Sequence, residues 1–292
     1  TGGNSSERKI SLISAKAVKE ALEENRHKVK LFDYKKGFIN LKKIIPKFDV
    51  IFPVLHGEEG EGGELQKFLS KTEKPFVGGD WKGFRKGWYK IPFKRFCDKN
   101  NIPTPVWKLV EQKKDIIKFG FPCVLKASNG GSSLEVVMIP KKNDLKKTKV
   151  NKLLKSKMPL FVEKLIKGVD ITISVLGDQA LPVIEIVPPE NEWFSYENKY
   201  SSETKEIPFA PSIAQDLQKK AQAAAIMIHK ELNLGHFSRI DFIVSDTTIY
   251  AIDVNTIPGM TPKSLFPKAA QAVGLNFPKL VQRLAEMARD QK

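Results

Sequence analysis

The stretch "IYAIDVNTIPGMTPKSL", from Ile249 to Leu265, ends an apolar run with Asp253 and Asn255, directly before a Pro-Gly turn. Side chains two residues apart on a β-strand project from the same face, so this carboxylate and this carboxamide point the same way. A second apolar run, "SRIDFIV", carries Asp241 and is separated from the first by the short turn "SDTT". The two runs predict a hairpin in which Asp241 faces Asp253 and Asn255 from the neighbouring strand.

Two carboxylates and one carboxamide oxygen that converge from adjacent strands form an all-oxygen set. Such a set suits Mg²⁺, which commonly binds one or two carboxylates together with substrate phosphates. Asp and Asn at a strand end also serve simply to satisfy the turn that follows. Taken alone, the three residues leave both interpretations open, a magnesium site and a plain strand end.

A phosphate-binding arrangement is indicated earlier in the chain. Lys126 ends the apolar strand "PCVLK", and the glycine-serine turn "SNGGSS" follows it. Backbone N–H groups and hydroxyls of such a turn approach an anion, and an ammonium group neutralises it, although no Walker A motif occurs. The segment "LFVEKLIKG" adds a linker from Glu163 to Ile166 whose backbone and carboxylate could read an adenine edge. An ordinary amphipathic connector explains the same letters.

Two further side chains fit the substrate end of a site. "GGNSSER" puts Glu7 in the first turn of a helix, where the helix dipole favours a carboxylate. Glu7 therefore either caps the helix or binds a substrate ammonium. His56, in "VLHGEEGEGG", ends a strand before a flexible loop. A lone histidine is more often structural than catalytic, so its role is open as well.

Composition argues against several classes of protein. The chain has 292 residues, of which 41% are hydrophobic, so two or three domains can form sizeable cores. No run of about 18 apolar residues occurs, so we expect no membrane span, and we recognise no secretory leader. Cys97 and Cys123 form no disulfide framework, which fits a reducing cytoplasm. The net charge of +16 comes from scattered lysines, which are typical of a solvated surface; nucleic-acid binding is the weaker alternative.

Helices and strands alternate near the start of the chain, which predicts a parallel sheet with ligands at the carboxyl ends of its strands. Strands are expected at 27–34 and 48–55. No strand precedes the opening glycine loop, so we expect that an initial strand is missing from this sequence. Further on, 169–177 and 179–187 predict a hairpin joined by Gly-Asp. Residues 188–209 have no period and predict a long functional loop.

In this order the motifs resemble those of the D-alanine–D-alanine ligase family, a branch of the ATP-grasp superfamily. The resemblance covers nearly the whole chain, from "GGNSSER" through "LHGEEGEGGELQ", "LKASNGGSS", "VEKLIKG", "YENKYSSET" and "RIDFIV" to "DVNTIPGMTPKSL". It implies an α/β, ATP-grasp fold of three domains, with ATP held between the second and third. They are an N-terminal parallel α/β substrate-binding domain at 1–78 without its first strand, a central ATP-grasp domain at 79–162 and a C-terminal catalytic domain at 163–292, the last two α+β.

The resemblance implies an enzyme that uses ATP to join two D-alanines into D-alanyl-D-alanine through an acyl phosphate. Its product would supply peptidoglycan synthesis and hence cell-wall biogenesis and cell shape. ATP is the expected co-substrate, with two Mg²⁺ ions (or Mn²⁺), in the cytoplasm; a homodimer is expected, and neither a membrane nor a specific nucleic acid is. Two alternatives stay open: another ATP-grasp ligase of carboxylate to amine, and a non-catalytic nucleotide- or RNA-binding relative.

The resemblance also implies catalytic roles for particular residues. Glu7, Ser132 and Tyr200 match a hydrogen-bonded trio that positions the first D-alanine and closes the loop over it. Arg239 and the backbone N–H of Gly259 match the oxyanion site.

Binding roles are implied in three further groups. The positions that bind substrate are His56, Lys199, Ser264 and Leu265. The ligands expected for the two metal ions are Asp241, Asp253 and Asn255. The expected contacts to ATP are Lys90, Lys126, Ser133, Glu163, Lys164, Ile166 and Asp170.

The sequence departs from the family pattern at several of these positions. Asp253 and Asp170 stand where the family usually has Glu, and each carboxylate is therefore one methylene shorter. Leu134 and Glu135 follow "GGSS", where a small or β-branched residue and then Gly are usual. The charge of Glu135 is unfavourable beside a phosphate unless its side chain points away.

Overall fold

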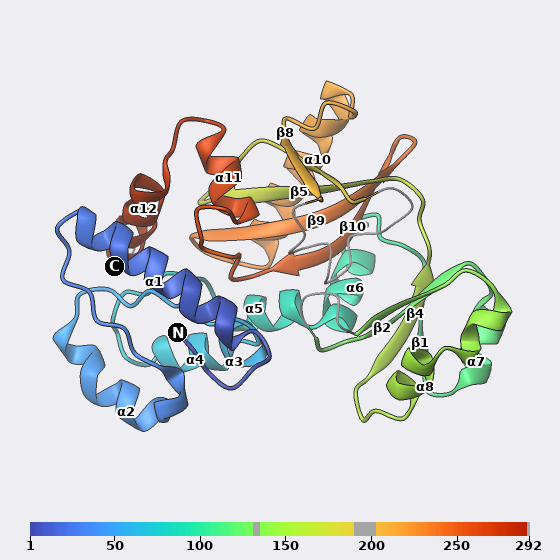
Figure 1. Cartoon of the computed structure of the whole chain (residues 1–292), viewed down its shortest axis with the longest axis horizontal. Coiled ribbons are helices and arrows are strands. Elements are labelled where there is room, and N and C mark those ends of the chain that lie inside the picture. Colours follow the sequence, from blue (N-terminus) through green and yellow to red (C-terminus); the bar gives the residue numbers. More distant parts are fainter. Residues whose placement is uncertain (131–134, 190–202, 291–292) are drawn as a thin grey trace.

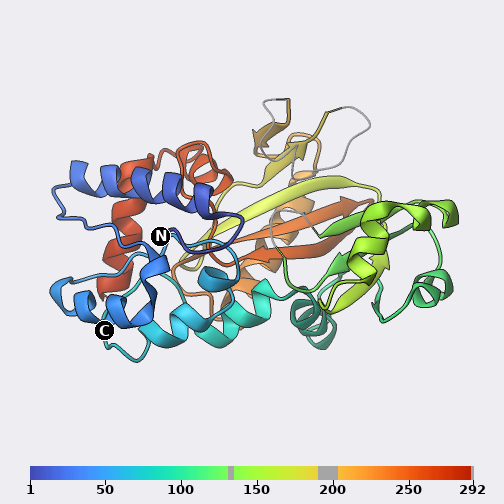
Figure 2. The ribbon, with the colours of Figure 1, turned by 60° about the horizontal axis from the view of Figure 1, so that its bottom comes forward.

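The computed structural model of the chain describes residues 1–130, 135–189 and 203–290. A helical N-terminal part and a small sheet lie at opposite ends of the molecule, and a larger sheet lies between them (Figures 1 and 2). Two antiparallel sheets with helices packed against them make this an α/β structure. The predicted domain boundaries stay a prediction, because buried side chains of α5 and α6, at 81–88 and 90–99, belong to the large core that also contains the C-terminal helices.

The N-terminal part consists mostly of helices around extended segments. Ala15, Val18 and Leu22 recur at helical spacing and form the buried face of α1. The helix ends at Glu24, and the backbone N–H of Asn25 donates to the carbonyl of Ala21. The elements of this part are α1 (Arg8–Glu24), η1 (Tyr34–Lys36), α2 (Gly37–Ile44), η2 (Ile45–Lys47), α3 (Glu58–Glu61) and α4 (Glu64–Leu69).

The parallel sheet predicted for this part is reduced to a single bridge in the described chain. One parallel bridge joins Ile51 to Phe76, and no strand is present at 27–34 within the described chain. The expectation of regular strands at 27–34 and 48–55 is therefore wrong for this structure. The physical reason is the lack of a ladder: among the described residues no backbone hydrogen bond joins the two segments, which line the same cavity.

The central part is a four-stranded antiparallel sheet with strand order β1-β4-β2-β3. Helices α7 and α8 lie on its outer side (Figure 1). One face of the sheet and these helices share a separate core, which includes Ile116, Leu125 and Val150. The elements here are β1 (Trp107–Val110), α7 (Lys113–Phe119), β2 (Cys123–Ala127), β3 (Val136–Ile139), η3 (Lys142–Lys146), α8 (Thr148–Leu154) and β4 (Leu160–Lys164).

The large sheet has strand order β10-β9-β5-β7-β8, and β6 pairs with β5 beside this path. Helix α10 packs on β5 and β9, α5 and α6 pack on β10, and α11 packs on β5. The remaining elements are α5 (Trp81–Trp88), α6 (Lys90–Lys99), β5 (Val169–Leu176), β6 (Gln179–Ala180), β7 (Ile184–Val187), β8 (Lys205–Pro208), α10 (Gln215–Glu231), β9 (Phe237–Ser245), β10 (Thr248–Asn255), α11 (Leu265–Gln271) and α12 (Phe277–Asp290).

Two strand predictions need correction here. The hairpin after β5 has its Gly177-Asp178 turn, but its second strand is split into β6 and β7. Pro182 lies at the break, where a residue without an N–H cannot continue the ladder. Residues 188–209, predicted as loop, contain the short strand β8, which pairs with β7. The four letters "KEIP" are too few to show a strand alternation.

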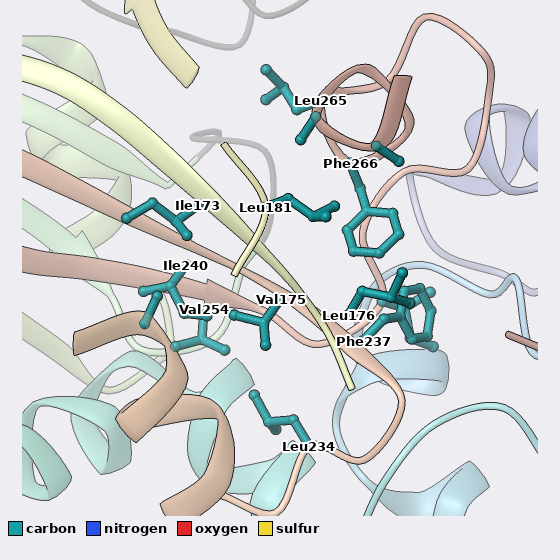
Figure 3. Packing of buried hydrophobic residues seen from close by; sticks show 14 of the residues in the cluster. Ile173, Val175, Leu176, Leu181, Leu234, Phe237, Ile240, Val254, Leu265 and Phe266 are labelled. Atoms are coloured by element: carbon teal, nitrogen blue, oxygen red, sulfur yellow. The ribbon is translucent and has the colours of Figure 1, made fainter. Parts of the chain in front are cut away.

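The large core fixes one face of the central hairpin. Ile173, Ile240 and Val254 come from three neighbouring strands and point toward the same side (Figure 3). Phe237 and Phe266 meet edge to face at 5.5 Å between ring centroids. Since alternate residues of a strand face opposite sides, this burial leaves the polar residues between them on the other face. No helix in the described ranges combines the length and apolar character that crossing a bilayer requires.

Candidate functional site

A pocket of about 740 Å³ lies between the two sheets. Its volume is in the range typical of small-molecule sites. One wall comes from β2 and β3, and the other from β5, β7, β9 and β10. Apolar side chains and charged groups alternate along these walls. The apolar lining includes Val124, Val136, Met138, Ile171, Ile186, Phe242 and Ile252.

A β-bulge in β10 sets the polar face of this pocket. Ala251 pairs with Phe242, but the next pair is Asp253 with Asp241, so Ile252 is an extra residue in its strand. Bulges of this kind re-aim side chains and are common beside active sites. Asp253 therefore lies directly opposite Asp241, where cross-strand Cβ atoms are about 5 Å apart.

Arg239 and Asn255 complete the same face, because they form the next-but-one pair of the ladder. The Asp241 carboxylate accepts hydrogen bonds from Arg239 Nε at 3.0 Å and from one terminal guanidinium nitrogen at 3.1 Å. It also accepts from Thr172 Oγ1 at 2.6 Å and Asn255 Nδ2 at 3.0 Å. Burial would lower the pKa of Arg239, but Asp241 outweighs burial and raises it.

Lys90, at the start of α6, neutralises the second carboxylate. Its Nζ lies 3.1 Å from both carboxylate oxygens of Asp253 and 3.3 Å from the carbonyl of Gly130. Each carboxylate of the hairpin thus has a protein cation beside it. This ammonium lies between the hairpin and the glycine turn that follows β2.

The donor set on this face fits a hard cation. No cluster of three His, Cys, Asp or Glu side chains occurs among the residues that the structure describes. Two opposed carboxylates with a neighbouring carboxamide remain, and Mg²⁺ is commonly held by one or two carboxylates plus the phosphates of its nucleotide. Asp241, Asp253 and Asn255 are therefore the residues that would hold magnesium.

A buried charge triad adjoins the pocket, which Lys126 and Glu163 help to line. Glu163 is on β4, and its carboxylate forms ion pairs with Lys94, on α6, and with Lys126, on β2, the latter at 2.5 Å. The Lys94 and Glu163 side chains are 1% and 3% exposed. Burial would raise the pKa of Glu163, but the two lysines outweigh burial and lower it. Lys94 Nζ also donates to Thr104 Oγ1, and that hydroxyl donates to the carbonyl of Ala251 at 2.8 Å.

Replacing Lys94 with methionine is expected to lower the free energy of unfolding by about 3 kcal/mol, since breaking one side of a buried ion pair leaves charge uncompensated. Lys99→Met is the matched control, because Lys99 is an exposed lysine on the same helix. Urea unfolding of both variants checks the prediction. A loss below about 1 kcal/mol at Lys94 would mean that Lys126 alone compensates Glu163.

The linker between the sheets also lines the pocket. Lys164, Ile166 and Asp170 are among its wall residues, with Lys126 and Glu163 nearby. This arrangement brings the predicted ATP contacts of the linker to one cavity. Their roles stay a prediction.

Two predicted residues, Glu7 and His56, lie with the buried Glu61 near Gly57 and Ile257. Glu61 Oε2 accepts from the N–H of Gly57 at 2.9 Å, and Oε1 accepts from that of Ile257 at 3.4 Å. Burial raises the pKa of Glu61 to about 8, and the nearby charge of Glu7 adds to that rise. Burial lowers the pKa of His56, which Glu7 opposes, and His56 also hydrogen-bonds the backbone of Ile257. Glu7 lies just before α1 as its N-cap residue and makes no capping hydrogen bond with its side chain.

The residues predicted to bind the second substrate lie at a tight turn before α11. The Ser264 hydroxyl lies 2.9 Å from Thr261 Oγ1 and accepts from the N–H of Thr261 at 3.2 Å. A Cβ at Gly259 would lie 2.9 Å from Ser264 Oγ, so a side chain there would displace this hydroxyl. Leu265 is buried in the large core.

Some predicted residues lie outside the described chain, and one departure from the family pattern can be placed. Glu135 folds back on Gly130, where a Cβ would lie 2.4 Å from Glu135 Oε2. Burial raises the pKa of this carboxyl. The residues outside the described ranges are Ser132, Ser133, Leu134, Lys199 and Tyr200.

Sequence reasoning missed two charged groups at the site, Lys94 and Glu61. Lys94 follows Lys90 by one helical turn, which places both lysines on one face of α6 but does not indicate that Lys94 is buried. Glu61 belongs to the glycine-rich sequence "GEEGEGGE" with three other glutamates, and the sequence pattern does not distinguish it from them. Their burial depends on elements distant in the chain, which explains the omission.

Comparison with known proteins gives concordant results. The family profile described as "D-ala D-ala ligase C-terminus" matches residues 91–286. The D-alanine–D-alanine ligase of Maridesulfovibrio salexigens is 34% identical over 292 residues, which cover 99% of this chain and 96% of that protein. The corresponding ligase of Aquifex aeolicus is 36% identical over 284 residues, covering 96% of each.

Solved structures agree with the sequence comparison. The crystal structure of a D-alanine–D-alanine ligase from Bacillus anthracis complexed with ATP superposes with a TM-score of 0.85 at 28% identity. A second structure of the Bacillus anthracis ligase gives a TM-score of 0.87 at the same identity. Each comparison covers 99% of this chain and 95% of the other. The predicted ATP-grasp fold is thereby confirmed.

Proposed function

The chain belongs to the D-alanine–D-alanine ligase family, and from this premise we propose that it joins two D-alanines into D-alanyl-D-alanine at the expense of ATP. The relatives named for this activity align with it over almost their whole length. The observation that carries the proposal is the pocket between the sheets. Lys90, Lys126, Asp241 and Asp253 all line it, and Lys90 Nζ lies 3.1 Å from the Asp253 carboxylate.

The first chemical task is to turn a carboxylate into an acyl phosphate. Phosphoryl transfer depends mainly on positioning and on neutralising charge. Lys126 and Lys90 supply positive charge to the phosphates, and the apolar side chains of β2, β3, β9 and β10 hold the base. Mg²⁺, held by Asp241, Asp253 and Asn255, would supply further charge neutralisation when bound.

Lys90 can pair either with the Asp253 carboxylate or with the phosphates in this scheme. Its Nζ lies 3.1 Å from Asp253. A cation bound by Asp253 would compete with that ion pair and release the ammonium toward the phosphates. Nucleotide and metal should therefore bind more tightly together than apart.

The second task is attack of an amine on the acyl phosphate. The tetrahedral oxyanion that forms needs preorganised donors. Arg239, fixed by its two hydrogen bonds to Asp241, and the N–H of Gly259 are the proposed donors. Gly259 is in the same loop as Ile257, whose N–H donates a hydrogen bond to Glu61 Oε1.

Substrate positioning falls to residues near the N-terminal part. Glu7 is proposed to bind the ammonium of the first D-alanine, with Ser132 and Tyr200 as its partners. His56 and Lys199 are proposed at the carboxylate and phosphate ends, and Ser264 and Leu265 at the second D-alanine. The electrostatic coupling of Glu7 to His56 and Glu61 supports a polar substrate end there.

The reaction is tested by mixing the protein with Mg-ATP and D-alanine and measuring ADP and dipeptide together. One dipeptide per ADP is expected, with no ADP above background when D-alanine is omitted. L-Alanine is the matched control. ADP release without dipeptide, or equal turnover with L-alanine, would argue for another ATP-grasp ligase.

Cellular context follows from the reaction. A cytoplasmic location is proposed because ATP is the co-substrate and because Cys97 and Cys123 are unpaired thiols. The dipeptide would enter peptidoglycan synthesis. A homodimer remains a prediction that sedimentation can test.

A further inference from the structure

The charges of the buried triad beside the pocket do not cancel. Lys94 and Lys126 both form ion pairs with Glu163, and the three side chains are 1%, 9% and 3% exposed. Within the described part of the chain, no second carboxylate forms an ion pair with either lysine. Two ammonium groups against one carboxylate leave a buried positive charge in excess. Because such a charge is costly without a partner, the triad favours binding of an anionic group beside it.

Only two members of the triad reach the pocket between the sheets. Lys126 and Glu163 line this pocket, whereas Lys94 is not among the described residues of its wall. Lys94 Nζ donates to Thr104 Oγ1 at 2.6 Å, and that hydroxyl donates to the carbonyl of Ala251 at 2.8 Å. These bonds hold the ammonium of Lys94 against Glu163. A ligand in the pocket therefore meets Lys126 and not Lys94.

The two ion pairs use different oxygens of the same carboxylate. Lys126 Nζ lies 2.5 Å from Glu163 Oε1, and Lys94 pairs with Oε2. Burial lowers the pKa of Lys94, and the Glu163 carboxylate opposes this shift, because an ion pair favours the charged forms of both partners. With Lys94 in place, the negative charge of Glu163 is already matched. Without Lys94, Glu163 and Lys126 would form a neutral pair.

We propose that Lys94 is a positioning residue for nucleotide binding, which neutralises Glu163 and thereby leaves the charge of Lys126 for a phosphate group. This inference rests on the proposed function, in which ATP occupies the pocket. Lys94 acts through Glu163 and Lys126 and touches no part of the ligand. Its effect therefore falls on the phosphates of the ligand and not on the nucleoside.

The test compares ADP with adenosine, which differ only in the phosphates. Calorimetric titration without Mg²⁺ gives the Kd of each ligand, and the ratio of the adenosine Kd to the ADP Kd is the readout. Lys94→Met should lower this ratio at least about tenfold, since charges interact strongly in a poorly solvated site. A general loosening of the fold would weaken both ligands alike and leave the ratio unchanged. Lys99→Met, an exposed lysine on the same helix, is the matched control.

Two further variants separate charge from packing. Lys94→Met combined with Glu163→Gln removes one positive and one negative group, so the excess charge on Lys126 returns. Its ratio should lie within about threefold of that of the unmodified chain. Lys94→Gln carries no charge, but its amide can still donate hydrogen bonds. It should lower the ratio as Lys94→Met does, and it provides the test if Lys94→Met fails to fold.

The results that would overturn the inference differ from those that would overturn the proposed function. An unchanged ratio in Lys94→Gln or in folded Lys94→Met, with ADP binding and ligation intact in the unmodified chain, would remove the inference alone. So would a double variant whose ratio is as low as that of Lys94→Met, because Lys94 would then act on the phosphates without Glu163. Failure of the unmodified chain to bind ADP would remove the proposed function and this inference together.

Discussion

Replacing Asp253 with asparagine is expected to reduce turnover about 10³-fold, since a metal ligand stabilises the transferred charge by several kcal/mol and 1.4 kcal/mol is a factor of ten. The side chain keeps its size, and the bulge keeps its direction. Asp241→Asn should behave in the same way, because the two carboxylates face each other across one ladder position. Phosphate release and dipeptide formation, followed over a series of Mg²⁺ concentrations, measure the effect.

Asp246→Asn is the matched control for both variants. Asp246 is exposed in the turn of the same hairpin and has a φ of +50°, which asparagine tolerates well. Its turnover should equal that of the unmodified chain, and all three variants should unfold at similar urea concentrations. Retention of more than a tenth of the turnover in Asp253→Asn, with the Mg²⁺ requirement unchanged, would remove Asp253 from the metal site.

Arg239→Lys is expected to lower kcat about 10²–10³-fold, as the loss of one oxyanion donor commonly does. Lysine keeps a positive charge beside Asp241 but cannot reproduce the planar fork that now makes two hydrogen bonds to it. The KM for ATP should change little, because the proposed role lies in the second step. Steady-state kinetics with both substrates varied separates the two constants.

Arg283→Lys gives the corresponding control, since Arg283 is exposed on α12. A large rise in the KM for ATP with kcat preserved would assign Arg239 to nucleotide binding. Both variants should unfold at the temperature of the unmodified chain, because the hydrogen bonds from Thr172 and Asn255 to Asp241 remain. Thermal unfolding therefore shows whether a lower kcat comes from loss of the fold.

The hairpin at 237–255 was predictable because two apolar runs flank a short polar turn, and each run is interrupted by an acidic residue at the same end. The convergence of Asp241 with Asp253 and Asn255 followed from that pairing. The bulge at Ile252 could not be predicted, because an extra residue inside an apolar run does not change the apolar pattern of the sequence. The order of the motifs indicated the family, and the two apolar runs around a short polar turn predicted the hairpin.

Other features depend on contacts that no local pattern contains. Lys94 looks like any helical lysine, and only the approach of β2 and β4 buries it against Glu163. The segment 27–34 contains strand-forming residues, but a strand needs a hydrogen-bonded partner, and among the described residues no backbone hydrogen bond joins this segment to 48–55. Propensity describes a residue, whereas pairing describes two segments at once.

The extra residue in β10 determines which face of the sheet each of the following side chains takes. Losing Ile252, or gaining one residue between it and Asp253, would exchange the two sides of the strand, sending carboxylates into the core and valine into the pocket. No single substitution could repair such a shift. Length changes within 248–255 should therefore be far rarer among functional variants than substitutions there, while the tip at Asp246 and Thr247 can grow or shrink freely.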